Sequence, residues 1–273
     1  MIHPTAIIHP KAEVDSTVEV GPYAIIEEGV VVGANCKVGP YVHLSGVTRI
    51  GEGNIFHPGA VIGNIPQDLK YRGAPSRTVI GDRNSFREHV TVNRATDETE
   101  DTVIGSQNLL MAGAHVGHNT RIGNQCIIAN GTLLGGHVDI QDRAVISGCC
   151  LVHQFVRIGT FAMMQGGAAI SMDLPPFVMA RGPNAICGLN VVGLRRAGVS
   201  SEERTELRRL YRFLFRGDLG LTAAVAEARK QFKGDLSVKM LDFIAGAKRG
   251  IPADVGRDRR AARREDASEE GGE

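Results

Sequence analysis

The 273-residue chain is predicted to form an all-β parallel β-helix followed by an α-helical domain. Reading every sixth residue from Ile2 to Ile170 gives 29 positions, of which 26 are Ile, Val, Leu, Phe or Met. Glycine often follows this aliphatic position, and small residues such as Ala60 and Cys126 often stand two positions before it. A six-residue period that keeps its register over this length is the signature of a hexapeptide β-helix. Beyond Ile170 the period stops and helix-forming residues become frequent.

The period has a simple geometric meaning. Each hexapeptide supplies a short strand whose first and third residues point inward, because side chains alternate across a strand. A turn follows, where glycine is expected to tolerate otherwise strained dihedral angles. Three such faces make one triangular coil, so about 170 residues give roughly nine stacked coils. The β-helix is assigned to residues 1–172.

Two polar segments interrupt the repeat, residues 63–77 and 93–101, and both are expected to form loops that leave the corners of the prism. The sequence from Asp173 to Pro176 is predicted to end the β-helix, and residues 173–251 are assigned to a helical domain. Ser200 and Glu203 form a candidate capping box for a helix that runs to about Phe215. Further helices are expected near 221–232 and 237–248, and residues 252–273 are expected to form a disordered tail.

Composition excludes several function classes. Lysine and arginine number 31 against 30 acidic residues, so no overall charge favours nucleic acid or a membrane surface. No stretch of about 18 apolar residues predicts a membrane span, and no leader pattern is visible, so we expect a cytoplasmic protein. The five cysteines lack a Cys-x-x-Cys pair, and Cys36, Cys126 and Cys150 fall in the inward small-residue position. These three are expected to be inert core thiols.

The histidines point to chemistry at one corner of the prism. His115 is the outward residue of a strand, and His118 lies in the corner that follows. One full coil beyond His118 stands Gly136, and a second coil leads to Gln154. One column therefore carries an imidazole, a glycine N–H and an amide, with His137 and His153 beside it. A general base next to an N–H donor suits acyl transfer to a hydroxyl, because the base accepts the proton and the donor stabilises the oxyanion. A hydrated surface corner remains the alternative.

Zinc is a competing interpretation, because hexapeptide helices can also bind zinc through histidines of adjacent faces. His115 and His118 are three residues apart, and no third ligand is evident beside them. The sequence therefore predicts neither a metal site nor a cofactor.

A set of motifs resembles one enzyme family closely. These motifs are residues 64–71 (NIPQDLKY), 87–88 (RE), 115–118 (HVGH), 135–137 (GGH), 152–155 (VHQF), 173–176 (DLPP) and 190–196 (NVVGLRR). In this order they resemble the UDP-N-acetylglucosamine O-acyltransferases over roughly residues 1–250. The resemblance implies a left-handed β-helix, a homotrimer with active sites between subunits, and acyl carrier protein as the thioester donor. The expected reaction transfers an (R)-3-hydroxyacyl chain to the 3-hydroxyl of UDP-N-acetylglucosamine, the first step of lipid A synthesis, without a covalent acyl-enzyme.

The same resemblance assigns roles to individual residues. His118 matches the catalytic base and Gly136 the oxyanion donor, while Gly166 matches the position that limits the depth of the acyl groove. The positions that match contacts to the nucleotide sugar are Asp68, Lys70, His115, His137, Gln154, Asn190 and Arg196. Without the motifs, a loop Asp–Lys pair or a helical arginine pair would be interpreted as solvated surface.

Three departures from the family pattern stand near these residues. Asn119 follows the base where some members have aspartate, so a carboxylate that orients His118 would have to come from elsewhere or be absent. Val192 replaces a glutamate of some members, and Ala197 replaces an arginine.

Alternatives to the expected activity remain. A related N-acyltransferase would normally add an N-terminal uridine-binding domain, whereas here the repeat begins at residue 2. An acyltransferase for a 3-amino nucleotide sugar and a non-catalytic hexapeptide scaffold both remain open.

Overall fold

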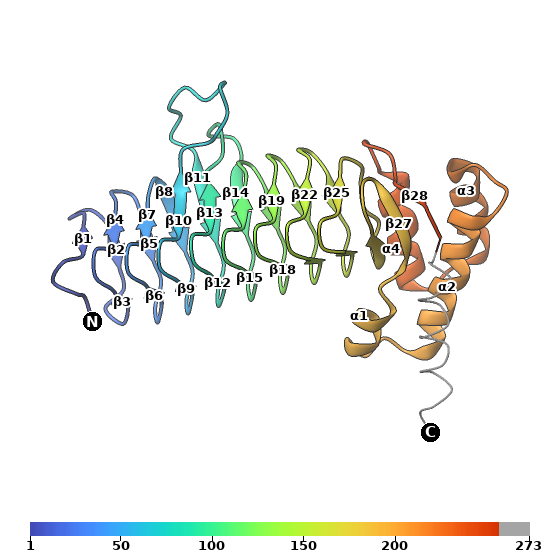
Figure 1. Cartoon of the computed structure of the whole chain (residues 1–273), viewed down its shortest axis with the longest axis horizontal. Coiled ribbons are helices and arrows are strands. Elements are labelled where there is room, and N and C mark those ends of the chain that lie inside the picture. The colour runs from blue at the N-terminus through green and yellow to red at the C-terminus, as the bar shows by residue number, and fades with distance from the viewer. Residues whose placement is uncertain (257–273) are drawn as a thin grey trace.

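The computed structural model describes residues 1–256 and forms a triangular prism of short parallel strands with helices at one end (Figure 1). The fold class expected from the sequence, a left-handed parallel β-helix with C-terminal helices, is confirmed. Most strands have two residues, the first facing outward and the second inward, as in His115 and Val116 of β16 (His115–Val116). Strands of neighbouring coils pair in register, so that Ile7, for example, lies beside Ile25 of the next coil.

Three sheets form the faces of the prism. The first face contains β1 (Ile7–Ile8), β4 (Ile25–Ile26), β7 (His43–Leu44), β10 (Val61–Asn64), β13 (Thr91–Asn93), β16, β19 (Leu133–Leu134), β22 (Leu151–Val152) and β25 (Ala169–Ile170). The second contains β2 (Glu13–Val14), β5 (Val31–Val32), β8 (Val47–Ile50), β11 (Arg77–Ile80), β14 (Asp101–Ile104), β17 (Arg121–Ile122), β20 (Asp139–Ile140) and β23 (Arg157–Ile158). The third contains β3 (Glu19–Val20), β6 (Lys37–Val38), β9 (Ile55–Phe56), β12 (Ser85–Phe86), β15 (Leu109–Leu110), β18 (Ile127–Ile128), β21 (Val145–Ile146), β24 (Met163–Met164), β26 (Val178–Ala180), β27 (Ala185–Leu189) and β28 (Ala253–Asp254).

The glycines that follow the aliphatic positions have a different role from the one expected. Gly117 and Gly135 do not adopt positive φ; instead, a Cβ on Gly117 would lie 2.7 Å from the carbonyl carbon of Gly135 in the next coil. The positive φ angles occur two residues later, at non-glycine residues such as Asn119 (58°) and His137 (57°) in some corners and at glycines in others, such as Gly131 (64°). The expected role of glycine in strained turns therefore holds for Gly131 but was wrong for Gly117 and Gly135. Gly117 and Gly135 are required because successive coils stack too closely at the corners for a side chain.

Both predicted loops leave the same edge of the prism, between the first and second faces (Figure 1). The first lies between β10 and β11, and the second between β13 and β14. Despite these insertions, the strands on either side still pair in register, Val61 with Thr91 and Thr91 with His115. The first loop lengthens its coil by two hexapeptides and the second by one. Because both insertions are whole multiples of the repeat, the inward positions are preserved.

The prism extends beyond residue 172, where the sequence analysis placed its end. β26 pairs in parallel with β24, and β27 then turns back antiparallel to β26. Leu174 and Phe177 are fully buried, so the segment around the two prolines closes the hydrophobic core. Residues 173–190 thus cap the prism before the first helix begins at Val191.

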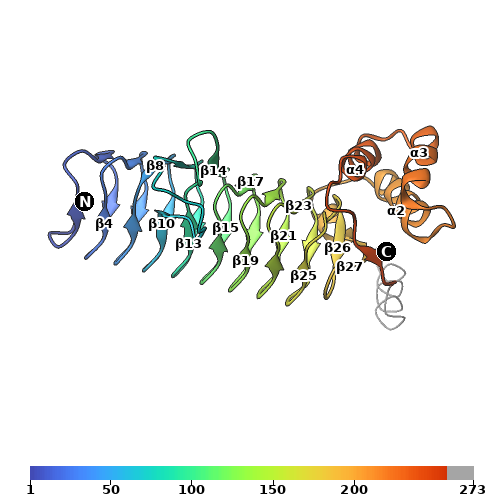
Figure 2. The ribbon, with the colours of Figure 1, turned by 90° about the horizontal axis from the view of Figure 1, so that it is seen from above.

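Between residue 190 and the last described residue, 256, there are four helices: α1 (Val191–Arg196), α2 (Ser201–Arg216), α3 (Leu221–Gln231) and α4 (Asp235–Ala245). Three of them match the expected helices, and the capping box of Ser200 and Glu203 is present at the start of α2. The view in Figure 2 shows these helices gathered beyond the last coils. None of the helices in residues 1–256 has the length and hydropathy needed to cross a membrane.

The start of the expected tail is ordered. Ala253 and Asp254 form β28, which pairs with β27, and the Asp254 side chain is 3% exposed where it binds Arg216 of α2. The prediction of disorder was therefore wrong for these residues, because a charged pair and a strand anchor them to α2 and the prism. The rest of the predicted tail, residues 257–273, lies outside the described residues.

Candidate functional site

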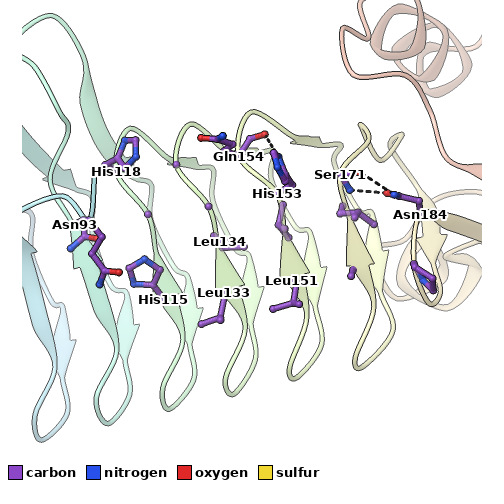
Figure 3. A pocket seen from close by; sticks show the side chains of 18 residues that line it. Asn93, His115, His118, Leu133, Leu134, Leu151, His153, Gln154, Ser171 and Asn184 are labelled. Atoms are coloured by element: carbon purple, nitrogen blue, oxygen red, sulfur yellow. Dashed lines mark hydrogen bonds between the residues drawn. The ribbon is translucent and has the colours of Figure 1, made fainter. Parts of the chain in front are cut away.

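A groove of about 630 Å³ runs along the first face, over β16, β19, β22 and β25 (Figure 3). Polar groups of His118, Gly136 and Gln154 line its edge, at the corner from which the loops leave in earlier coils. Its floor is aliphatic, formed by outward residues of successive strands that include Leu133 and Leu151. The groove is therefore polar at one edge and apolar across the face, and its size suits a small ligand.

The imidazole of His118 is the best-placed proton acceptor of the groove. Its Nδ1 lies 2.9 Å from Oδ1 of Asn119, and its Nε2 lies 3.8 Å from Oδ2 of Asp68. The ring meets that of His137 edge-on, with centroids 5.2 Å apart. Its side chain is 12% exposed, so neighbouring groups hold it in place. One ring nitrogen is thus engaged by an amide while the other faces an open site.

Gly136 lies directly against this imidazole. A Cβ built on Gly136 would come within 2.5 Å of Cε1 and Nε2 of His118. Only a glycine leaves room for the ring in this position. Within residues 1–256, no group accepts a hydrogen bond from the Gly136 N–H. A free N–H beside a basic nitrogen is the arrangement that acyl transfer requires.

The pKa values of the two neighbouring histidines are lowered, which favours their neutral form. Burial lowers the pKa of His115, and the nearby charge of His118 lowers it further. The pKa of His137 is lowered mainly by burial and then by His118, while Glu100 acts in the opposite direction. His115 is also tied to Thr91, whose hydroxyl lies 2.7 Å from Nδ1. These rings therefore suit hydrogen bonding to a polar ligand.

The two loops bind each other and cover the corner at His118. The guanidinium of Arg94 donates to the hydroxyl of Tyr71 at 2.9 Å, and the amide of Asn93 donates to the carbonyl of Ile65 at 3.0 Å. Within the first loop, Asp68 accepts from the N–H of Lys70 at 2.8 Å. The Lys70 side chain is exposed. These contacts set Asp68 opposite the Nε2 of His118.

The structure brings together six of the predicted site residues and leaves four apart. The residues grouped around the groove are Asp68, His115, His118, Gly136, His137 and Gln154. Lys70, Asn190 and Arg196 do not line it, and neither does Gly166, which lies in the corner before β25. Asn190 caps α1 through the N–H of Gly193 at 2.9 Å, and α1 lies well away from the loops in Figure 1.

Several residues of the site escaped the sequence analysis. Asn93 and Asn184 line the groove, and Phe155 stacks on His137 with centroids 4.5 Å apart. Thr96 and Glu100 of the second loop bind Asn119, the residue next to His118. The only sequence feature that could have pointed to Glu100 was the acidic run from Asp97 to Asp101, and this run by itself predicted only a polar loop.

The cysteine prediction can be compared directly with the structure. Cys36, Cys126 and Cys150 are fully buried, and burial raises the pKa of Cys126 to about 11. A thiol with a raised pKa is a poor nucleophile, so their assignment to the core is confirmed. Among residues 1–256, no three His, Cys, Asp or Glu side chains are grouped so as to hold a metal ion.

Comparison with known proteins identifies the family. Residues 173–252 match the model of UDP-N-acetylglucosamine O-acyltransferase domain 2, and residues 29–64 and 101–136 match the bacterial transferase hexapeptide model. An acyl-(acyl-carrier-protein)-UDP-N-acetylglucosamine O-acyltransferase of Anaeromyxobacter sp. is 45% identical over 92% of this chain and 98% of its own length.

Solved structures give the same result. The UDP-N-acetylglucosamine acyltransferase of Bacteroides fragilis superposes with a TM-score of 0.89 at 42% identity, covering 92% of this chain and 99% of that protein. The corresponding protein of Acinetobacter baumannii has a TM-score of 0.88 at 36% identity, with coverage of 92% and 99%. These similarities extend over the prism and the helices together, so the chain belongs to the UDP-N-acetylglucosamine O-acyltransferase family of acyltransferases.

Proposed function

We propose that this protein transfers an (R)-3-hydroxyacyl chain from acyl carrier protein to the 3-hydroxyl of UDP-N-acetylglucosamine, the first step of lipid A synthesis. The observation that carries the proposal is the contact between His118 and Gly136. An imidazole nitrogen and an uncommitted backbone N–H face the same polar edge of a groove whose floor is aliphatic. The substrates come from the names of the relatives, and the groove suits both a polar acceptor and an acyl chain.

The proposed mechanism is direct transfer. Nε2 of His118 accepts the proton of the sugar 3-hydroxyl while the oxygen attacks the thioester carbonyl carbon. The carbonyl oxygen becomes an oxyanion that accepts a hydrogen bond from the Gly136 N–H. The carbon–sulfur bond then breaks, and the imidazolium returns its proton to the departing thiolate of the carrier. Base and oxyanion donor act on one tetrahedral centre, so no acyl-enzyme is needed.

The other predicted residues divide between two subunits in this proposal. Asp68, His115, His137 and Gln154 would contact the sugar at the polar edge of the groove. Asn190 and Arg196 would contact the nucleotide bound at a neighbouring subunit of a homotrimer, which agrees with their absence from the groove of their own chain. An arginine at this position suits a phosphate, because its guanidinium presents paired donors. Lys70 would reach the phosphates from the exposed loop.

Mass spectrometry tests the reaction directly. UDP-N-acetylglucosamine is incubated with the enzyme and a mixture of 3-hydroxyacyl carrier protein thioesters of different lengths. We expect one acylated nucleotide sugar, whose mass gives the chain and whose lability to mild alkali shows an ester. An alkali-stable amide formed only with a 3-amino acceptor would contradict the proposed acceptor. Failure of every thioester to give a product would favour a non-catalytic scaffold.

Chain length provides a second prediction, at Gly166. A Cβ on this glycine would have only the carbonyl oxygen of Gly148 nearby, at 3.6 Å, so a side chain can begin here without a clash in the isolated chain. We expect the wild type to use a long 3-hydroxyacyl chain, and Gly166→Met to favour shorter donors by filling the end of the acyl groove. Relative kcat/KM values measured in mixed-donor competition check this. An unchanged order of preference would remove Gly166 from this role.

Docking of the acidic carrier protein is expected to involve arginines of α2, which recur at helical spacing. Arg204 binds the carbonyl of Val199 and Arg216 binds Asp254, so these two are already engaged. Arg209 and Arg212 are exposed, and the guanidinium of Arg209 also lies over the ring of Phe232, 5.8 Å from its centroid. We expect the double variant Arg209→Glu with Arg212→Glu to raise the donor KM and to change its salt dependence, with the acceptor KM unchanged.

The exposed Arg49, on the prism remote from the helices, offers a control as Arg49→Glu, to be compared with each single α2 variant because it also reverses one charge. If the acceptor KM rose instead in the α2 variant, α2 would serve the nucleotide rather than the carrier.

A further inference from the structure

The residue next to the proposed base is locked in place by the second loop. Asn119 is 4% exposed and adopts a left-handed φ of 58°. Its side-chain oxygen accepts hydrogen bonds from the N–H and the hydroxyl of Thr96, each at 3.1 Å. Its side-chain nitrogen donates to Oε2 of Glu100 at 3.0 Å. The buried amide is therefore bound at both ends by residues of one loop.

These contacts allow only one orientation of the amide. A backbone N–H can only donate and a carboxylate can only accept, so the oxygen must face Thr96 and the nitrogen must face Glu100. The same oxygen lies 2.9 Å from Nδ1 of His118. Because an amide oxygen cannot donate, Nδ1 must carry the imidazole proton in the neutral ring. The lone pair is then on Nε2, the nitrogen that faces Gly136 and the groove.

We propose that Glu100 is a positioning residue that fixes the tautomer of His118 through the amide of Asn119. This inference rests on the proposed function, in which His118 is the base. Glu100 would also polarise the amide and strengthen its oxygen as an acceptor, since linked hydrogen bonds reinforce one another. Some family members have an aspartate at the position of Asn119, which could orient the base directly. In this protein the second loop would supply the orienting carboxylate, and it would act through the neutral amide of Asn119.

A double-mutant cycle separates this role from general structural support. In the otherwise wild-type protein, Glu100→Ala should lower kcat about tenfold, by analogy with the hydrogen-bond partners of metal-bound histidines, whose loss costs about 10–100-fold. The KM for UDP-N-acetylglucosamine should not change. In the Asn119→Asp background, Glu100→Ala should cause no further loss of kcat. The carboxylate introduced at position 119 accepts the hydrogen bond from Nδ1 of His118 without help, and Glu100 only places a second negative charge beside it.

Two further variants serve as comparisons. Glu98→Ala removes another exposed carboxylate of the same loop and should leave kcat unchanged. Glu100→Gln should keep kcat near that of the wild type, because its amide oxygen can still accept from Asn119. An equal loss for Glu100→Gln and Glu100→Ala would assign the effect to charge and overturn the proposal. So would equal losses in both backgrounds of the cycle, or a rise in KM at constant kcat.

Nitrogen-15 NMR of the imidazole gives a test that does not depend on activity. We expect His118 of the wild type at neutral pH to be protonated on Nδ1 in its neutral form, and Glu100→Ala to produce a mixture of tautomers. An Nε2-protonated ring in the wild type would overturn the inference. If His118→Ala retained full turnover, the proposed base would fail, but the tautomer result would still report whether Glu100 orients the ring.

Discussion

Replacing His118 with alanine is expected to lower kcat by about 10²–10⁴, the usual contribution of a general base. The sugar hydroxyl is far too weak an acid to ionise at neutral pH, so it needs an acceptor for its proton. The carboxylate of Asp68 lies 3.8 Å from Nε2 of His118. It is not expected to replace the imidazole, because a carboxylate is a much weaker base. Steady-state kinetics at saturating donor and acceptor measures the loss.

His115→Ala is the matched comparison for this variant. His115 lines the same groove, but its Nδ1 is engaged by Thr91, so we expect mainly a higher acceptor KM. Because His118 is 12% exposed and packs against His137, thermal unfolding must show that His118→Ala is folded. A folded His118→Ala enzyme with near-wild-type kcat would refute the mechanism and direct attention to His137.

The rate should also depend on pH in a defined direction. Only a neutral imidazole can accept a proton, so kcat is expected to fall as the pH is lowered. The lowered pKa values of His115 and His137 keep those two rings neutral to lower pH than an ordinary histidine. The fall of kcat at low pH should therefore disappear in His118→Ala and persist in His115→Ala. Measurement of kcat across the acid range in both variants checks this.

Gly136→Ala is expected to have an effect of similar size for a different reason. The new methyl group would lie 2.5 Å from the His118 ring, so the ring must move, although the Gly136 N–H remains. A displacement of about an ångström can cost about 10²-fold in rate. Gly136 has no positive φ, so the substitution introduces no backbone strain. We therefore expect a folded protein with a low kcat.

The coupling between the two positions can be measured. If Gly136→Ala acts by displacing His118, the double variant with His118→Ala should be no slower than His118→Ala alone. Gly220→Ala is a suitable control, because a Cβ on this residue, which lies before α3 and outside the groove, would meet nothing within 4 Å. Additive losses in the double variant would show that Gly136 acts independently of the imidazole.

The sequence by itself determined the architecture of the prism. The six-residue period needs no long-range information, because each aliphatic residue repeats the environment of its counterpart in the preceding coil. The same arithmetic brought His118, Gly136 and Gln154 to one corner, and the structure places all three along the groove. The inward cysteines followed from the same register.

Tertiary structure decided what lies outside the period. Leu174 and Phe177 are buried at the end of the prism, where the hexapeptide pattern no longer marks the inward residues. The role of the corner glycines depends on the distance to the next coil, which a sequence does not contain.

The surroundings of the His118 imidazole were also decided by the tertiary structure alone. Loops have no period, so nothing in the sequence placed Asp68 opposite Nε2 or Glu100 against the amide of Asn119. Both loops leave the same edge of the prism as His118, and that shared edge brings their carboxylates to the imidazole. A repeat determines where its own residues lie, whereas contacts made by inserted loops depend on how those loops fold against it.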